Sequence, residues 1–284
     1  MNPINPVRPS PIAGSWYSSN ADQLHQEIEG YLSAARNPDI NGRLVGLIAP
    51  HAGYFYSGAT AGFAYQMVKG LSFDLCVLVS PLHNYQPYPL LTSAHNTYAT
   101  PLGQIEVDHD LLNKFNILLN AAGLTQSQPI ANDREHSLEI QLPFLQTALA
   151  APFRLLPLMI RTSDPGYISK AAKVLANLIR EKKVLLVAST DLSHFYEEST
   201  ANVLDQAMLK HMTDFSPEGV LQAEADEEGF ACGSGAVAFV LWTAKALGAN
   251  QVSLLDYSTS ARASKDTSSV VGYGALAITS QEAV

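Results

Sequence analysis

Short apolar runs alternate along the chain with segments in which apolar residues recur at helical spacing. Runs that are apolar at nearly every position predict strands buried on both faces, as in a parallel sheet. These runs are Leu44–Ala49, Leu75–Ser80, Phe153–Ile160, Val184–Ala188, Val252–Leu255 and Val270–Ile278. Helical spacing or a proline start predicts helices over Ala21–Ala34, Gly58–Val68, His109–Leu119, Ser137–Leu149, Asp164–Ile179, Thr200–Met212, Pro217–Glu224 and Ser234–Leu247. The alternation predicts an α/β fold with a central, mostly parallel sheet flanked by helices.

The chain carries no internal linker and no low-complexity segment, so we expect one domain over residues 1–284. One segment resists assignment. Pro87–Gly103 is rich in Pro, Tyr, Thr and Leu, and it fits either a small hairpin or a long loop.

Composition narrows the class of protein. Hydrophobic residues make up 47% of the 284 residues and charged residues 15%, which excludes a disordered chain. The formal net charge of -9 argues against a nucleic-acid-binding protein, because phosphate neutralisation requires a basic face. No run is long and apolar enough for a membrane span, and the first residues lack the apolar core of a secretory signal. Two cysteines make no disulfide framework, so we expect a cytoplasmic protein.

Three of the predicted strands end in polar residues suited to chemistry. His51 follows the first strand in LIAPHAGY, His83 follows the second in LVSPLHNY, and Asp191 and His194 follow another in LVASTDLSH. Ligands of open α/β sheets bind beyond the carboxyl ends of the strands. If these strands are parallel neighbours, the three imidazoles and the carboxylate share one crevice.

Cys232 is a further candidate, because it precedes the small-residue turn that opens an apolar helix, in CGSGAVAFVLW. A cysteine at a helix N-terminus can have a lowered pKa, and its thiolate is both a nucleophile and a soft metal ligand. The alternative is a small buried side chain at a tight turn.

Two further groups of residues also have two interpretations. Glu135 and His136, in NDREHSLEIQLPFL, either contribute to the site or only begin a helix. The aromatic residues Trp16, Tyr54 and Tyr56 either line a pocket beside His51 or pack in the interior.

An ordered set of motifs runs through the chain: RPSPIAGSWY, APHAGYFYSGATA, SPLHN, EHSLEIQLPFLQ, STDLSHF, CGSGA and VVGYGALAI. Together they resemble the Memo family, whose microbial members are called AmmeMemoRadiSam system protein B. The matching blocks cover about residues 8 to 279. The resemblance implies a fold similar to the class III, non-haem-iron extradiol dioxygenases, with a metal crevice at a central sheet.

The resemblance also implies roles for the strand-end residues. His51 and His83 match the two metal-site histidines of the family, and Cys232 matches the cysteine that stands where the dioxygenases have a carboxylate ligand. His194 matches the acid/base histidine of the dioxygenases, and Asp191 the acidic residue beside it.

Trp16 and Tyr56 match positions that are associated, in animal members, with binding phosphotyrosine-containing peptides. SPLHN departs from the family, which more often has Gly before the Pro, and we expect this to alter a turn only. The family name implies a functional association with radical-SAM and AMMECR-type proteins.

Two imidazoles and one anionic ligand suit non-haem Fe(II), and a thiolate extends the choice to copper or zinc. We therefore expect an iron- or copper-binding redox protein or oxygenase that acts on an unknown small molecule. One alternative is a peptide- or protein-binding module that uses the crevice. The other is a metal-free hydrolase or transferase with Cys232 as nucleophile.

Overall fold

The computed structural model describes residues 5–281. Its main sheet has nine strands in the order β10-β12-β2-β9-β3-β8-β4-β7, with β11 paired to β12. These strands are β2 (Arg43–Ala49), β3 (Leu75–Pro81), β4 (Leu90–Ser93), β7 (Gln128–Ile130), β8 (Arg154–Ile160), β9 (Val184–Ser189), β10 (His194–Tyr196), β11 (Gln251–Thr259) and β12 (Val270–Ser280). A second sheet has three strands, β1 (Val7–Arg8), β5 (Thr97–Thr100) and β6 (Gly103–Glu106).

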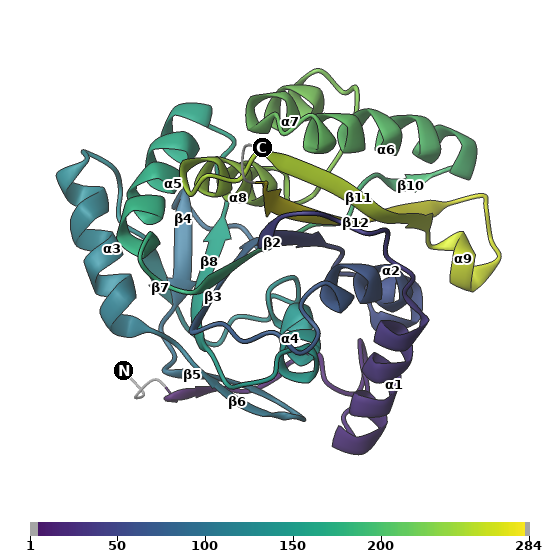
Figure 1. The fold of residues 1–284 in the computed structure, drawn as a ribbon, viewed down its shortest axis with the longest axis horizontal. Helices are drawn as coiled ribbons and strands as arrows, with labels where there is room; N and C mark the ends of the chain where they lie inside the picture. Colours follow the sequence, from purple (N-terminus) through teal and green to yellow (C-terminus); the bar gives the residue numbers. More distant parts are fainter. Residues whose placement is uncertain (1–4, 282–284) are drawn as a thin grey trace.

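Helices cover both sides of the main sheet. They are α1 (Ala21–Ala34), α2 (Tyr54–Gln66), α3 (His109–Ala121), α4 (Leu142–Ala148), α5 (Pro165–Ile179), α6 (Glu198–Thr213), α7 (Pro217–Ala225), α8 (Ser234–Ala246) and the short α9 (Ala261–Ser264). Figure 1 shows α5, α6, α7 and α8 on one side of the sheet and α1, α2 and α4 on the other. Every residue of α8 from Ala236 to Ala244 is buried, which explains its almost uniformly apolar sequence.

The α/β fold is confirmed, but the main sheet is mixed and the prediction of a mostly parallel sheet is wrong. The inner strands β2, β9, β3 and β8 are parallel neighbours, whereas β12 runs antiparallel to β2, β11 and β10, and β4 runs antiparallel to β8. Burial on both faces makes a strand apolar throughout, whichever way its neighbours run. Nearly all of β12 is buried, so its sequence carries no sign of its direction.

Local sequence accounts for most helix boundaries. The side chain of Asn20 caps α1 by accepting a hydrogen bond from the amide of Gln23, and Asp164 caps α5 by accepting one from Gly166. The helix expected over Gly58–Val68 begins earlier, at Tyr54. The helix expected over Ser137–Leu149 is a 3-10 turn, η1 (Glu139–Gln141), followed by α4.

The segment Pro87–Gly103 contains the first arm and the turn of a small hairpin, one of the two forms expected for it, and a further strand before that arm. Its first part forms β4, which joins the main sheet between β8 and β7. Its second part forms β5, which pairs antiparallel with β6 and parallel with β1. The segment therefore links the two sheets and brings the N-terminal strand beside them.

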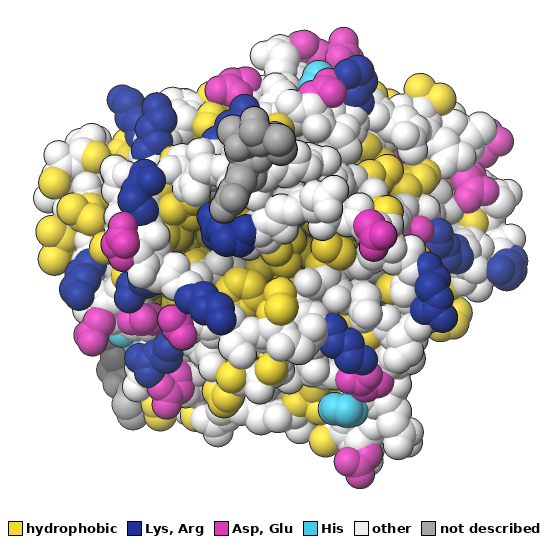
Figure 2. Space-filling view, viewed as in Figure 1, with side chains coloured by type: hydrophobic (Ala, Val, Ile, Leu, Met, Phe, Trp, Pro, Cys, Tyr) yellow, Lys and Arg dark blue, Asp and Glu magenta, His cyan; other side chains and the backbone are white. Residues whose placement is uncertain are grey.

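The core and the surface agree with the composition. One large cluster contains most of the buried hydrophobic side chains. On the face shown in Figure 2, Lys and Arg side chains lie interspersed with Asp and Glu. Among the described residues, every helix is too short or too polar to cross a lipid bilayer. A single domain over residues 1–284, which includes residues outside the described range, stays a prediction.

Candidate metal centre

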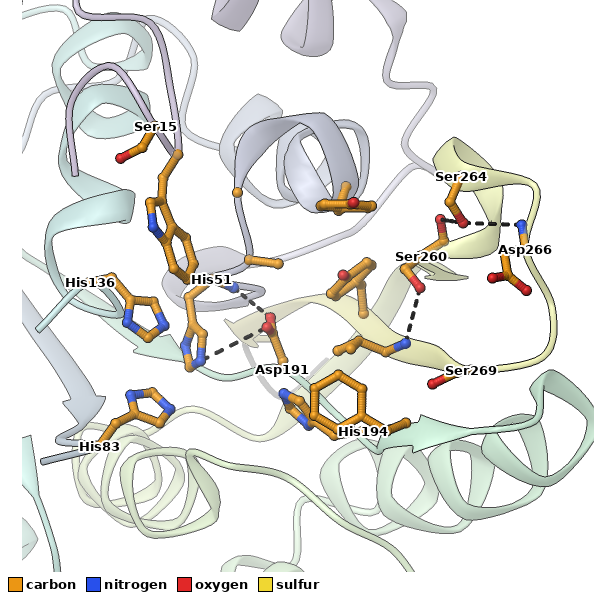
Figure 3. A pocket seen from close by; sticks show the side chains of 17 residues that line it. Ser15, His51, His83, His136, Asp191, His194, Ser260, Ser264, Asp266 and Ser269 are labelled. Carbon is orange, nitrogen blue, oxygen red and sulfur yellow. Dashed lines mark hydrogen bonds and ion pairs between the residues drawn. The ribbon is translucent and has the colours of Figure 1, made fainter.

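Three parallel strands deliver the predicted residues to one edge of the sheet. Strands β2, β9 and β3 are adjacent, in that order, so their carboxyl ends lie together. His51 follows β2, and its ring centroid lies 5.4 Å from that of His83, which follows β3. The ring centroid of a third imidazole, His136, lies 5.4 Å from that of His51 and 4.7 Å from that of His83. Each of the three offers a ligand atom, and these atoms lie within 4.8 Å of one another (Figure 3).

The protonation of His51 follows from its neighbours. Its Nδ1 lies 3.0 Å from Ser189 Oγ, which donates its own hydrogen to the carbonyl of Ser137 at 2.6 Å. Ser189 Oγ also accepts a hydrogen bond from Gln141 Nε2. The hydroxyl can therefore only accept from His51, so Nδ1 carries the hydrogen and Nε2 keeps its lone pair. Burial lowers the pKa of His51, which favours this neutral form.

Glu135 orients His83 in the same way. One carboxylate oxygen accepts from His83 Nδ1 at 2.9 Å and the other from the His83 amide at 2.6 Å. The amides of His136 and Ser137 also donate to this carboxylate. Burial alone would raise the pKa of Glu135, but the hydrogen bonds, first that from His83, hold it well below its ordinary value. The ionised carboxylate keeps the Nδ1 hydrogen on His83 and, through this hydrogen bond, raises the pKa of the imidazole. Nε2 is then the ring atom that a metal ion would bind in place of a proton.

The sequence left two interpretations open for His136, a contribution to the site or a helix start, and the structure places it as the third imidazole of the cluster. Trp16 packs against it with ring centroids 4.2 Å apart. Burial lowers the pKa of His136 to about 4, so the imidazole is neutral at physiological pH. The sequence signal was ambiguous because the same residues also precede η1 and α4, as a helix start would.

A buried ion-pair network that the sequence analysis missed holds this segment in place. Arg8, on β1, is 2% exposed. Its guanidinium nitrogens lie 2.7 Å from a carboxylate oxygen of Asp133 and 2.5 Å from one of Glu139. Its guanidinium also donates to the carbonyl of Glu135 at 2.8 Å. Tyr17 donates to Glu139 at 2.8 Å. The N-terminal segment is thereby fixed beside the residues that carry His136.

Asp191 and His194 lie next to the imidazoles, as expected. Asp191 accepts a hydrogen bond from the amide of His51 at 2.6 Å, and burial raises its pKa to about 7. His194 Nδ1 lies 2.8 Å from the carbonyl of Leu192, which can only accept, so Nε2 keeps its lone pair. The next residue, Phe195, has a φ of 66° and is 74% exposed.

Cys232 lies beside His51 but outside the group of three. Its Sγ is 3.1 Å from His51 Nε2, and the amide of Asp191 donates to it at 3.3 Å. Burial, together with the Asp191 carboxylate, raises the pKa of this thiol, in contrast to the lowered value expected at a helix start. The helix itself begins two residues later, at Ser234. A role for Cys232 as a ligand stays a prediction.

A cavity of about 660 Å³ opens at the imidazoles. Trp16 and Tyr56 line it, together with Asp191 and His194. Tyr54 takes the other role considered for it, because it is buried and donates to the carbonyl of Ile140 at 2.8 Å.

Comparison with known proteins agrees with this arrangement of motifs. Residues 8–277 match the family model described as Memo-like protein. A MEMO1 family protein of Methanosarcina barkeri is 32% identical, covering 96% of this chain and 100% of its own. Another, of Nitrosopumilus maritimus, is 30% identical over 95% of this chain and 98% of its own. The uncharacterized protein JW3007 from Escherichia coli K12 has a similar fold, with a TM-score of 0.52 and 12% identity over 82% of this chain and 99% of its own.

Proposed function

The chain belongs to the Memo-like protein family, and on that premise we propose that its three imidazoles hold a non-haem metal ion. The supporting observation is that the ligand atoms of His51, His83 and His136 lie within 4.8 Å of one another, with the Nδ1 hydrogen of His51 directed to Ser189 and that of His83 to Glu135. Such a donor set suits iron, copper and zinc. We propose iron first, in a redox protein or oxygenase, with copper or zinc as the alternatives.

The fit is supported by the partners behind the imidazoles. Ser189 and Glu135 fix the hydrogen on Nδ1 of His51 and His83, as outer partners of metal-ligating histidines do. A bound iron ion would supply the contact with O2 and the electrons that the side chains themselves lack.

His194 and Asp191 are the proposed proton carriers. A general acid or base works best when its pKa lies near the working pH, and the buried Asp191 meets this condition with a pKa of about 7. His194 lines the same cavity and offers a free Nε2 as a base, with its ring fixed by the Leu192 carbonyl. Trp16, which packs against His136, and Tyr56 line the same cavity.

Anaerobic loading with Fe(II), followed by O2-uptake measurements with ascorbate as reductant, tests this proposal. We expect about one iron per chain and O2 consumption. His194→Gln should retain the iron but slow O2 consumption by about 10²–10⁴-fold, the usual contribution of a general acid or base. The exposed His25→Gln is the matched control and should leave both unchanged. Folded protein that binds no iron, copper or zinc would overturn the proposal.

A binding module remains the second candidate, because Tyr56, which lines the cavity, and the neighbouring Phe55 are exposed aromatic side chains. Phe55 is 68% exposed and Tyr56 is 44% exposed, and both stand in the first turn of α2. In the binding-module hypothesis, a peptide or protein partner contacts these two side chains together with Trp16. If Trp16→Ala still binds every partner that the wild type captures in a pull-down, the hypothesis is wrong. An association with radical-SAM and AMMECR-type proteins stays a proposal that the family name implies.

The metal-free hydrolase or transferase has weaker support. The raised pKa of Cys232 keeps it as a thiol. The amides that would stabilise an oxyanion are already bonded: that of Cys232 to the Asp191 carbonyl, and that of Gly233 to Thr190 Oγ1.

A further inference from the structure

The cavity extends well beyond the imidazoles. Figure 3 shows the three imidazoles at one end, Asp191 and His194 in the middle, and a group of serines with Asp266 at the other end. This far end is built by α9 and the loop that leads into β12. A volume of about 660 Å³ exceeds what a metal ion and a diatomic molecule need, and it falls within the range of pockets for organic molecules.

The far end is rich in hydrogen-bond acceptors. Ser264 Oγ donates its hydrogen to the carbonyl of Ser260 and accepts a hydrogen bond from the amide of Asp266. Asp266 Oδ1 accepts from both the amide and the hydroxyl of Ser268, at 2.9 and 2.7 Å. These bonds lower the pKa of Asp266, so this exposed carboxyl is ionised at neutral pH. Its other oxygen, Oδ2, has no hydrogen-bond partner within residues 5–281.

No Lys or Arg side chain among the described residues that line the cavity offsets this charge, and two of these residues, Asp191 and Asp266, are acidic. The neighbouring Lys265 directs its ammonium to the carbonyl of Arg262 at 2.8 Å. Arg262 itself pairs with Asp256 at 2.6 Å. The far end would therefore repel an anionic group of a bound molecule and attract a cationic one.

The remaining lining includes aromatic side chains: Trp16, Tyr56, Phe195 and Tyr273. Aromatic rings pack against apolar or aromatic ligands, and their faces attract ammonium groups. Phe195 has a left-handed backbone conformation, which is energetically unfavourable for a bulky residue. Such strained conformations are found most often at active and ligand-binding sites.

We propose that the cavity binds an organic amine. Its apolar or aromatic body lies among the aromatic side chains, and its protonated amino group lies at the far end against Asp266. This goes beyond the metal centre and does not depend on it. It also disfavours phosphorylated peptides, whose charge is of the wrong sign for this cavity.

Three probes of one shape test the inference: 4-phenylbutylamine, 4-phenylbutan-1-ol and 4-phenylbutanoate, titrated into full-length protein without added metal. Dissociation constants come from NMR chemical-shift titrations. We expect the amine to bind at least several-fold more tightly than the carboxylate, with the alcohol between them. Asp266→Asn should weaken the amine by about 2- to 5-fold, the usual value of an exposed ion pair, and barely change the alcohol.

Two further variants locate the effect. Asp39→Asn removes the same charge from an exposed residue outside the cavity, and it should leave all three constants unchanged. Phe195→Ala should weaken all three probes together, because it removes part of the wall. The inference is wrong if the carboxylate binds as tightly as the amine, if Asp266→Asn and Asp39→Asn behave alike, or if no probe binds. A failure of the metal proposal would leave these results unaffected.

Discussion

Glu135→Gln perturbs the group that orients one of the three imidazoles. The carboxylate is 2% exposed, and its two oxygens accept hydrogen bonds from the His83 ring and from the amides of His83, His136 and Ser137. A glutamine amide has one oxygen and one NH2 group. If its oxygen keeps the three donors at Oε1, its NH2 group faces the His83 amide, and two donors then meet.

The magnitude follows from this count. A buried donor left without an acceptor costs about 1–3 kcal/mol, and hydrogen bonds to a charged acceptor are stronger than those to a neutral one. We therefore expect Glu135→Gln to lower the free energy of unfolding by about 2–3 kcal/mol. The His83 ring also loses the carboxylate that fixes its Nδ1 hydrogen, so metal affinity should fall by about 10- to 100-fold.

Urea unfolding measures the first quantity and competition with a chelator of known affinity the second. Glu29→Gln is the control, because Glu29 forms a surface ion pair with the partly exposed Lys69. It should change stability by less than about 1 kcal/mol and leave metal affinity unchanged. A Glu135→Gln variant with wild-type stability and affinity would refute the orientation of His83 derived from its hydrogen bonds.

Three further predictions concern stability. Gly272→Ala should lower the free energy of unfolding by about 2–3 kcal/mol, because a Cβ there would lie 1.9 Å from Asp205 Oδ2. In a double-mutant cycle, the same substitution in an Asp205→Ala background should lower it by at least about 1 kcal/mol less. Burial raises the pKa of Asp205, so the stability that this carboxyl contributes is present below its unfolded pKa of about 3.8 and is lost as pH rises through its folded pKa. The free energy of unfolding of Asp205→Asn, relative to that of the wild type, should therefore rise over that pH range. Urea unfolding at several pH values measures it. Phe195→Gly should be more stable than Phe195→Ala by about 1 kcal/mol in thermal unfolding, because only glycine adopts the φ of 66° freely, and equal stabilities would contradict this.

The sequence predicted six of the nine strands of the main sheet and missed β4, β7 and β10, and it predicted the location of those six better than their direction. Each apolar run corresponds to a strand, and the residues after β2, β3 and β9 meet at the same edge. The direction of β12 was hidden because a strand covered on both faces is apolar in either orientation.

The composition of the site was predictable only in part. His51 and His83 follow strands, and strand ends are a general location for ligands. His136 comes after the edge strand β7 and not directly after one of the inner parallel strands. It joins the other two imidazoles because an ion pair between Arg8 and Glu139, 131 positions apart, holds its segment. No local pattern encodes such a contact. His95 shows the same limit, since the polar sequence around it gives no sign of burial and yet it is fully buried, with hydrogen bonds to Asn5 and Asn132.

Metal affinity in single-ligand variants tests the central claim most directly. Protein purified anaerobically without a His-tag is titrated with Fe(II), in the wild type, His51→Ala, His136→Ala and Cys232→Ser, and bound metal is measured by mass spectrometry. Three imidazoles as the ligand set predict about one iron per chain in the wild type and in Cys232→Ser, and loss of the metal in both histidine variants. Folded protein that loses the metal in Cys232→Ser and keeps it in His136→Ala would contradict the account, and would place the thiol in the ligand set instead.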